Sequence, residues 1–369
     1  MYITTVVNVG APDDLSGRID SAPIASLLQK TIDAGEAPAI AVSVFTPNAK
    51  LVLLHGFRDM ESRSTVAPDD FFHLGSCTKA ITAFVAARLV DQGLLSWEKT
   101  LADLFPDWLA TTNEVYHQKT LTEFLSHRAG VQPFTGGEEF IKTPAHIMEM
   151  QNPAARQEFS RWVLTLDPAT DPESPIVYSN AGYSVAASMM EKASQRSWEN
   201  LVQQEFADLF EIDILFGHPH LTQEQQPRGH IIPKEWEVGN SEVLTPLPDS
   251  LGYTIFLSEP AGDVSASISA YAKYLQEILL GLNGQGRFLK PATYQHLFFA
   301  REDYALGWGN PKINGLQILN HDGSDGTFYC NTNLIKEANY GLAILANSGT
   351  EKTINAVYAI HDWIHANIK

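Results

Sequence analysis

Cysteine and long apolar runs are what this sequence has least of. Only two of its 369 residues are cysteines, Cys77 and Cys330, so we expect no disulfide framework. No run of about 18 apolar residues occurs, so no segment is expected to cross a membrane as a helix. Residues 1–5 lack a basic stretch followed by an apolar core, and we expect no signal peptide. These absences predict a cytoplasmic protein, or a periplasmic or secreted one if a leader has been removed.

Basic charge is also scarce. The chain carries 43 acidic and 25 basic residues, which gives a formal net charge of −18. Nucleic acids and anionic membrane surfaces are bound through basic patches, so we expect neither as a partner. The 44% of hydrophobic and 18% of charged residues make an ordinary globular balance that can bury a core. The oligomeric state stays open.

The chain is organised around a serine and a lysine three residues apart. Ser76 and Lys79 come just before a stretch, 80–90, that is apolar at nearly every position. In a helix, residues at i and i+3 share a face, so the amine would lie against the hydroxyl. A helix that is apolar all round is buried, and burial lowers the pKa of a lysine because it disfavours the charged form. The pattern predicts a serine nucleophile with a lysine base, although a capping serine beside a solvated lysine also fits it.

A second Ser-x-x-Lys motif shows how weak the pattern is alone. Ser96 and Lys99 follow Gly93 in a segment that we interpret as a surface turn. Cys77, next to Ser76, is another candidate nucleophile, but a lone cysteine is usually a small buried hydrophobic residue. The rest of the chain has to distinguish these readings.

Periodicity and capping signals predict strands at both ends of the chain and helices in its middle. Residues 1–20 are polar and expected to be loosely held. Residues 217–260 are expected to form a long connecting segment. Ser265 is expected to cap a helix over 266–282. The other expected helices are 23–34, 76–93, 153–166, 180–194, 198–210 and 351–368, and the expected strands are 39–46, 51–56, 316–320, 327–334 and 340–346.

The short links between the C-terminal strands indicate an antiparallel sheet. The predicted fold class is therefore α+β, an antiparallel sheet flanked by helices with a mostly helical second lobe. We assign 1–90 and 226–369 to the sheet domain and 91–225 to the helical lobe. The active site is expected in the cleft between them, because sites are usually built between lobes.

Two polar motifs lie downstream of Ser76. They are Tyr178-Ser179-Asn180 and His321-Asp322-Gly323-Ser324. With Ser-x-x-Lys at a helix start, Tyr-Ser-Asn in a loop and His-x-Gly at a late strand, the sequence resembles the class C β-lactamase and low-molecular-weight penicillin-binding protein family. That family includes related esterases and D-amino-acid peptidases. The resemblance covers roughly residues 20–365, and the segments 125–130, 178–183, 260–262 and 306–309 agree with it.

The resemblance implies that Ser76 attacks a carbonyl carbon and becomes acylated. Lys79 and Tyr178 would share the role of general base. A tyrosine with its ordinary pKa of about 10 serves only if cations stabilise its phenolate or if it relays a proton to Lys79. The residues do not choose between these two possibilities. Asn180 would hold Lys79 and the acyl side chain by hydrogen bonds.

The same resemblance assigns the rest of the site. The backbone N–H groups of Ser76 and Ser324 would form an oxyanion hole, where developing negative charge is stabilised. Gly323 would leave room for a substrate beside its strand. His321 stands where many β-lactamases of the family carry lysine. Since histidine is mostly neutral at pH 7, His321 would attract a substrate carboxylate only weakly, or would serve to orient Tyr178.

The resemblance therefore implies cleavage of an ester or amide bond in a small molecule, with β-lactam hydrolysis as a possible side activity. The first alternative is a class C β-lactamase or D-Ala-D-Ala peptidase proper. An alternative of another class is a catalytically silent protein that binds a peptide or acts as a scaffold. No cofactor is expected. His218, His220 and His230 are the best case for a metal site, but their spacing is unlike that of zinc sites, so we interpret them as a solvent-facing loop and expect no metal.

Overall fold

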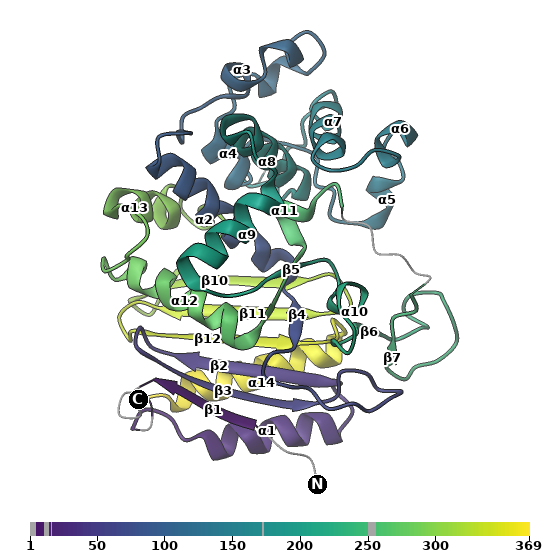
Figure 1. Cartoon of the computed structure of the whole chain (residues 1–369), viewed down its shortest axis with the longest axis vertical. Coiled ribbons are helices and arrows are strands. Elements are labelled where there is room, and N and C mark those ends of the chain that lie inside the picture. The colour runs from purple at the N-terminus through teal and green to yellow at the C-terminus, as the bar shows by residue number, and fades with distance from the viewer. Residues whose placement is uncertain (1–4, 11–14, 16, 172, 250–255) are drawn as a thin grey trace.

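The computed structural model describes residues 5–10, 15, 17–171, 173–249 and 256–369. Within these ranges, seven strands form one antiparallel sheet in the order β1-β3-β2-β12-β11-β10-β9 (Figure 1). The strands are β1 Thr5–Gly10, β2 Ala39–Phe45, β3 Ala49–Gly56, β9 Lys312–Ile313, β10 Leu316–Ser324, β11 Tyr329–Ile335 and β12 Tyr340–Ala346. The predicted antiparallel sheet flanked by helices is confirmed.

Strands from the two ends of the chain meet in the middle of this sheet. β2 pairs with β12, so that Val42 lies opposite Ile344. β1 pairs with β3 along its whole length. The expectation that residues 1–20 are loosely held is therefore wrong for residues 5–10, because main-chain ladder hydrogen bonds tie down a terminal strand whatever its side chains are.

Each face of the sheet packs on its own hydrophobic core. In β2 the side chain of Val42 belongs to one core and that of Ala41 to the other, as strand alternation requires. Helices α1 and α14 cover the first face, which we call the outer face, and α2 and α12 cover the inner face (Figure 1). These helices are α1 Ser21–Asp33, α2 Thr78–Asp91, α12 Ile268–Leu282 and α14 Glu351–Asn367.

The middle of the chain is mostly helical and lies beyond the inner face, towards the top of Figure 1. Its helices are α3 Leu101–Leu104, α4 Leu121–Leu125, α5 Gly137–Phe140, α6 Ala145–Met148, α7 Ala154–Val163, α8 Asn180–Ser194 and α9 Trp198–Phe210. The predicted helices over 180–194 and 198–210 are confirmed. No helix in the described ranges is long and apolar enough to cross a membrane.

Short elements complete the chain. They are the strands β4 Phe71–His73, β5 Leu215–Phe216, β6 His230–Ile231, β7 Thr245–Pro246 and β8 Val264–Ser267, and the helices α10 Pro219–Thr222, α11 Glu259–Gly262 and α13 Pro291–Phe299. β8 pairs with both β4 and β5. Ser265 is thus a strand residue and the predicted cap is wrong. The side chain of Ser267 caps α12 instead, by accepting a hydrogen bond from the N–H of Ala270.

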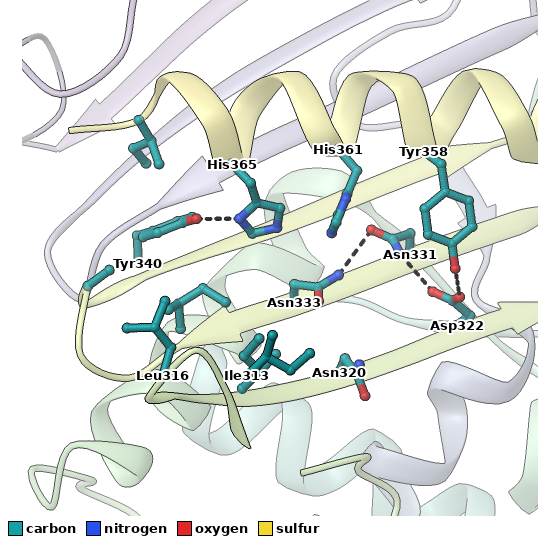
Figure 2. A pocket seen from close by; sticks show the side chains of 14 residues that line it. Ile313, Leu316, Asn320, Asp322, Asn331, Asn333, Tyr340, Tyr358, His361 and His365 are labelled. Atoms are coloured by element: carbon teal, nitrogen blue, oxygen red, sulfur yellow. Dashed lines mark hydrogen bonds between the residues drawn. The ribbon is translucent and has the colours of Figure 1, made fainter. Parts of the chain in front are cut away.

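β10 is longer than predicted and carries the whole His321–Ser324 motif. A pocket of about 590 Å³ lies on its outer face, between β9–β11 and α14 (Figure 2). Asn320 and Asp322 are among the residues that line this pocket. Because successive side chains of a strand alternate between faces, His321 and Gly323 point to the inner face. The inner face is where Ser76 lies.

Candidate active site

The turn that carries Ser76 is a single 3-10 turn, Gly75–Cys77, which leads directly into α2. Gly75 has a φ of +50°, and a methyl group on it would come within 2.5 Å of the backbone N of Ser324. Glycine is needed there both for its backbone conformation and for the close approach of β10. Ser76 stays partly exposed, whereas Cys77 is fully buried. The structure therefore leaves Ser76 as the accessible group of the turn.

Lys79 is fully buried in the first turn of α2, and its Nζ lies 3.0 Å from Oγ of Ser76. The amine also donates to Oδ1 of Asn180 at 2.8 Å and to the carbonyl oxygen of Ala261 at 2.7 Å. Nδ2 of Asn180 donates to the carbonyl of Phe134 at 3.0 Å, which fixes the orientation of that amide. Burial lowers the pKa of Lys79 well below its ordinary value.

The second Ser-x-x-Lys motif has none of these features. Ser96 and Lys99 are both exposed and belong to a turn in which the N–H of Lys99 donates to the carbonyl of Ser96. Its interpretation as a surface turn is confirmed. The two motifs differ in burial, and burial depends on the apolar residues that follow each of them.

Tyr178 lies on the other side of Lys79, just before α8. The Lys79 Nζ is 4.7 Å from the centre of the Tyr178 ring, and the phenol lies next to the Ser76 side chain. Burial raises the pKa of Tyr178 above its ordinary value, although the contact with Ser76 opposes this. A neutral phenol is therefore favoured over a phenolate.

His321 bonds to a different tyrosine from the one expected. Its Nε2 lies 3.0 Å from the hydroxyl of Tyr304, and its Nδ1 lies 2.7 Å from the carbonyl oxygen of Asp322. The ring of Tyr304 packs at 6.4 Å from that of Tyr178 in an edge-on arrangement. His321 thus contacts the tyrosine cluster through Tyr304, and the suggestion that it orients Tyr178 directly is not what the contacts show.

Gly323 is packed against the nucleophile turn. A methyl group on it would come within 2.0 Å of the Leu74 carbonyl oxygen and 2.8 Å of the Ser76 backbone N. The absence of a side chain therefore lets β10 approach the turn, rather than leaving room for a substrate as expected. The hydroxyl of Ser324 donates to the carbonyl of Phe328 and accepts from the N–H of Gly326.

The main-chain N–H of Ser324 points away from β11. Asn320 exchanges both of its main-chain hydrogen bonds with Gly309, on the side of β10 opposite β11. In an antiparallel strand the main-chain groups of alternate residues point to the same side. The N–H of Ser324 therefore points to that same edge, which at this position borders the turn of Ser76.

Two side chains of this site were missed at the sequence level, His127 and Tyr304. The ring of His127 lies 4.2 Å from that of Tyr178 and 4.9 Å from that of Tyr304. Its Nδ1 accepts a hydrogen bond from the N–H of Ser179. Burial lowers its pKa well below the ordinary value, so the imidazole is neutral. His127 belongs to the segment 125–130, and Tyr304 lies just before the segment 306–309. Both segments agree with the family resemblance, but no residue in or beside them was assigned a role from the sequence.

The histidines considered for a metal site are not solvent-facing. His218 and His230 are both buried, and His218 Nε2 is paired with Asp325 at 2.7 Å. Nδ1 of His230 lies 3.0 Å from the carbonyl oxygen of Asn347. The described ranges hold no group of three or more His, Cys, Asp or Glu side chains arranged to bind a metal ion.

Comparison with known proteins finds relatives that match most of the chain. An unguisins hydrolase of Aspergillus violaceofuscus is 23% identical over 92% of this chain and 63% of its own length. The chain thus spans about three-fifths of that relative. A penicillin-binding protein homologue of Pyrococcus abyssi, solved as an octamer, superposes with a TM-score of 0.73 at 20% identity, covering 95% of this chain and 79% of that one.

A D-amino acid amidase of Ochrobactrum anthropi superposes equally well, with a TM-score of 0.73 at 16% identity over 93% of this chain and 98% of that one. At such identities the superpositions show the fold alone. The family model described as Beta-lactamase matches residues 24–364, which takes in the Ser76 turn, the Tyr178 loop and β10. The chain therefore belongs to the beta-lactamase family.

Proposed function

We propose that this protein is a serine hydrolase that cleaves an ester or amide bond through an acyl-enzyme on Ser76. The observation that carries the proposal is the buried Lys79 amine 3.0 Å from the Ser76 hydroxyl. Burial removes the water that would otherwise stabilise an ammonium ion, and a neutral amine beside a hydroxyl is a base within reach of its proton.

The hydrogen-bond partners of Lys79 can accommodate a neutral amine. A neutral amine has two N–H groups and one lone pair. Two of the three partners of Nζ, Asn180 Oδ1 and the carbonyl of Ala261, can only accept. The third partner, the Ser76 hydroxyl, can donate. When the amine is neutral, its two N–H groups go to the two acceptors, and its lone pair is left for the serine proton.

The reaction then runs in two halves. The Ser76 proton moves to Lys79 Nζ while Oγ forms a bond to the substrate carbonyl carbon, and the carbonyl electron pair moves to oxygen. The backbone N–H groups of Ser76 and Ser324 hold this oxyanion. The pair returns, the bond to the leaving group breaks, and the leaving group takes a proton. Water attacks the acyl-enzyme in the same way and restores Ser76.

Tyr178 acts in this scheme as a neutral phenol. It lies next to both Ser76 and Lys79, so it can pass the proton from the ammonium to the leaving group. Its raised pKa disfavours the alternative in which a phenolate takes the serine proton. Lys79 is therefore the base and Tyr178 the proton relay.

For the substrate we favour an amide or ester with no free carboxylate near the reacting carbonyl. The His321 ring is held between the hydroxyl of Tyr304 and the carbonyl oxygen of Asp322. A histidine, unlike a lysine, brings no permanent positive charge to β10. The relatives' names include a hydrolase of unguisins and an amidase of D-amino acids. Amides, including those of D-amino acids, are the first substrates to try.

The test measures turnover of a panel of substrates by the purified protein and by Ser76→Ala. The panel is a D-amino acid nitroanilide with its L-enantiomer, a nitrophenyl ester and a chromogenic cephalosporin. We expect turnover of the nitroanilide or the ester that disappears in Ser76→Ala. Fast turnover of the cephalosporin alone would support a β-lactamase proper, and no turnover of any compound would support a silent binding protein. Equal activity of the two proteins would overturn the serine mechanism.

A further inference from the structure

Behind the Ser76 turn, two histidines and two aspartates form a buried cluster that the proposed mechanism does not use. Its members come from four separate segments and have almost no exposed side-chain surface. They are His73 of β4, His218 before α10, Asp263 before β8 and Asp325 after β10. We call this set the His–Asp cluster.

His73 is at the centre of the His–Asp cluster. Its Nε2 lies 3.2 Å from Oδ1 of Asp263, and its Nδ1 lies 3.5 Å from Oδ2 of Asp325. Nε2 of His218 lies 2.7 Å from the same Oδ2. The other oxygen of Asp325 accepts from the N–H groups of Thr327 and Phe328, both at 2.7 Å. Every oxygen of this buried carboxylate therefore has a partner.

The charges in the cluster support one another. Burial lowers the pKa of His73, but the Asp325 and Asp263 carboxylates outweigh burial and raise it. Burial raises the pKa of Asp325, but His73, His218 and the backbone N–H groups outweigh it and lower the pKa below its ordinary value. Removing one member of such a buried set leaves an uncompensated charge, and the neighbouring segments must then shift.

One end of the cluster holds the nucleophile turn. The N–H of Gly75 lies 3.3 Å from Nδ1 of His73 and donates to it when that nitrogen carries no proton. When Nδ1 is protonated it faces Asp325 instead. In both states the imidazole lies next to Gly75, the residue before Ser76.

The other end holds the turn after β10. Asp325 follows Ser324, and its carboxylate fixes the turn 325–328 through the N–H groups it accepts. The N–H groups of Ser76 and Ser324 border the same spot, since methyl groups on Gly75 and Gly323 would fall within 2.5 Å and 2.8 Å of the opposite backbone nitrogen. The cluster thus contacts both segments that carry these two N–H groups.

We propose that the His–Asp cluster is a positioning device that sets the two backbone N–H groups of Ser76 and Ser324 against each other as one oxyanion hole. The proposal rests on the proposed function, because the hole is part of that mechanism. Such donors are effective only when they lie about 2.7–3.1 Å from the oxyanion. A small relative shift of the two segments therefore lowers the rate of the chemical step and leaves substrate binding largely intact.

The main test is Asp325→Asn, which keeps the shape of the side chain and removes its charge. We expect kcat to fall about tenfold to a hundredfold with KM within about twofold, as for loss of transition-state stabilisation alone. The affinity for phenylboronic acid, whose adduct with serine places an oxygen in the hole, should fall with kcat. The matched control is Glu277→Gln, which removes another fully buried carboxylate, one paired with Arg287 away from the site. It should change kcat by no more than about twofold.

A second variant and a second readout keep the proposal testable if Asp325→Asn folds poorly or the protein proves inactive on the panel. Asp263→Asn changes the more peripheral carboxylate. In protein labelled with ¹⁵N-serine, the amide signals of both Ser76 and Ser324 should move in either cluster variant and stay in place in Glu277→Gln. Folded cluster variants with unmoved serine signals, or with wild-type kcat and boronate affinity, would overturn the proposal. An inactive wild type with moved signals would instead count against the proposed function and not against the positioning role.

Discussion

At the scale of single residues, the proposed mechanism depends on the protonation of Lys79 and Tyr178. Both are buried, and burial disfavours the charged form of each. For a lysine that means a lowered pKa and for a tyrosine a raised one, as found here. The same environment favours a neutral amine and a neutral phenol, and on this ground the proposed mechanism makes Lys79 the base.

The pH profile of kcat/KM tests this assignment. A base works only in its deprotonated form, so activity should be lost as the pH falls through the lowered pKa of Lys79 and should level off well below pH 10.5. Tyr178→Phe should lower kcat/KM by about 10²–10⁴-fold because the relay is lost, while the midpoint of the profile stays. A midpoint that disappears in Tyr178→Phe would identify the tyrosine as the base.

Gly323→Ala tests the close approach of β10 to the nucleophile turn. The added methyl group meets the Leu74 carbonyl oxygen at 2.0 Å, and that oxygen is backbone. We expect a loss of at least about 1–3 kcal/mol of unfolding free energy together with most of the activity, measured by denaturant unfolding and turnover. At Gly136 a methyl group meets nothing within 4 Å, and Gly136→Ala should leave both nearly unchanged. Equal behaviour of the two variants would contradict the packing described here.

Much of the candidate site could be predicted from residue types in order along the chain. Ser76, Lys79 and Asn180 come together as expected. His127 and Tyr304 could not be predicted, because a buried histidine and a tyrosine have no distinctive spacing and their importance comes from which rings they contact. Gly323 was noticed for the wrong reason, since only the fold shows which segment it lies against.

At the scale of elements, the outer and inner faces of the sheet separate stability from chemistry. α14 buries Val357, Ile360 and Ile364 on the outer face, whereas Ser76 and Lys79 lie on the inner side. Three side chains spaced three and four residues apart along one stripe are what an amphipathic helix provides. Changes in this stripe should therefore act on stability alone.

Ile360→Ala measures that separation. Ile360 is almost fully buried, and its truncation should cost about 2–5 kcal/mol of unfolding free energy. kcat at a temperature where the variant is folded should match the wild type. Ile141→Ala removes the same atoms from a side chain that is 82% exposed and should cost no more than about 0.5 kcal/mol. A large loss of kcat in folded Ile360→Ala would show that the two faces are coupled.

Elements with strong caps and long periodic patterns were predictable, and those decided by pairing were not. The helix over 180–194 begins where Ser179 caps it. Ser265 lies in strand β8 because two segments distant in sequence, Phe71–His73 and Leu215–Phe216, pair with that strand. β1 likewise exists because β3 offers a free edge. Local sequence does not contain such partners.

At the scale of the whole molecule, one core joins the sheet to the helical middle. The same hydrophobic cluster contains Ala41 of β2, Phe84 of α2, Phe159 of α7 and Met189 of α8. The division into 1–90 with 226–369 and 91–225 stays a prediction, and this shared core argues that the two parts do not unfold independently. Reversible calorimetric unfolding should therefore show one transition with matching calorimetric and van't Hoff enthalpies. Two separate transitions would indicate independent domains.

The most direct test of the central claim is the mass of the intact protein after brief exposure to acyl donors. The wild type and Ser76→Ala are incubated side by side with a penicillin and, separately, with an activated ester. The reactions are quenched in acid, and the intact proteins are measured by mass spectrometry. We expect the activated ester to add one acyl group to the wild type, located at Ser76 by peptide mapping, and none to Ser76→Ala. An acyl group on both proteins, or hydrolysis that persists in Ser76→Ala, would contradict it.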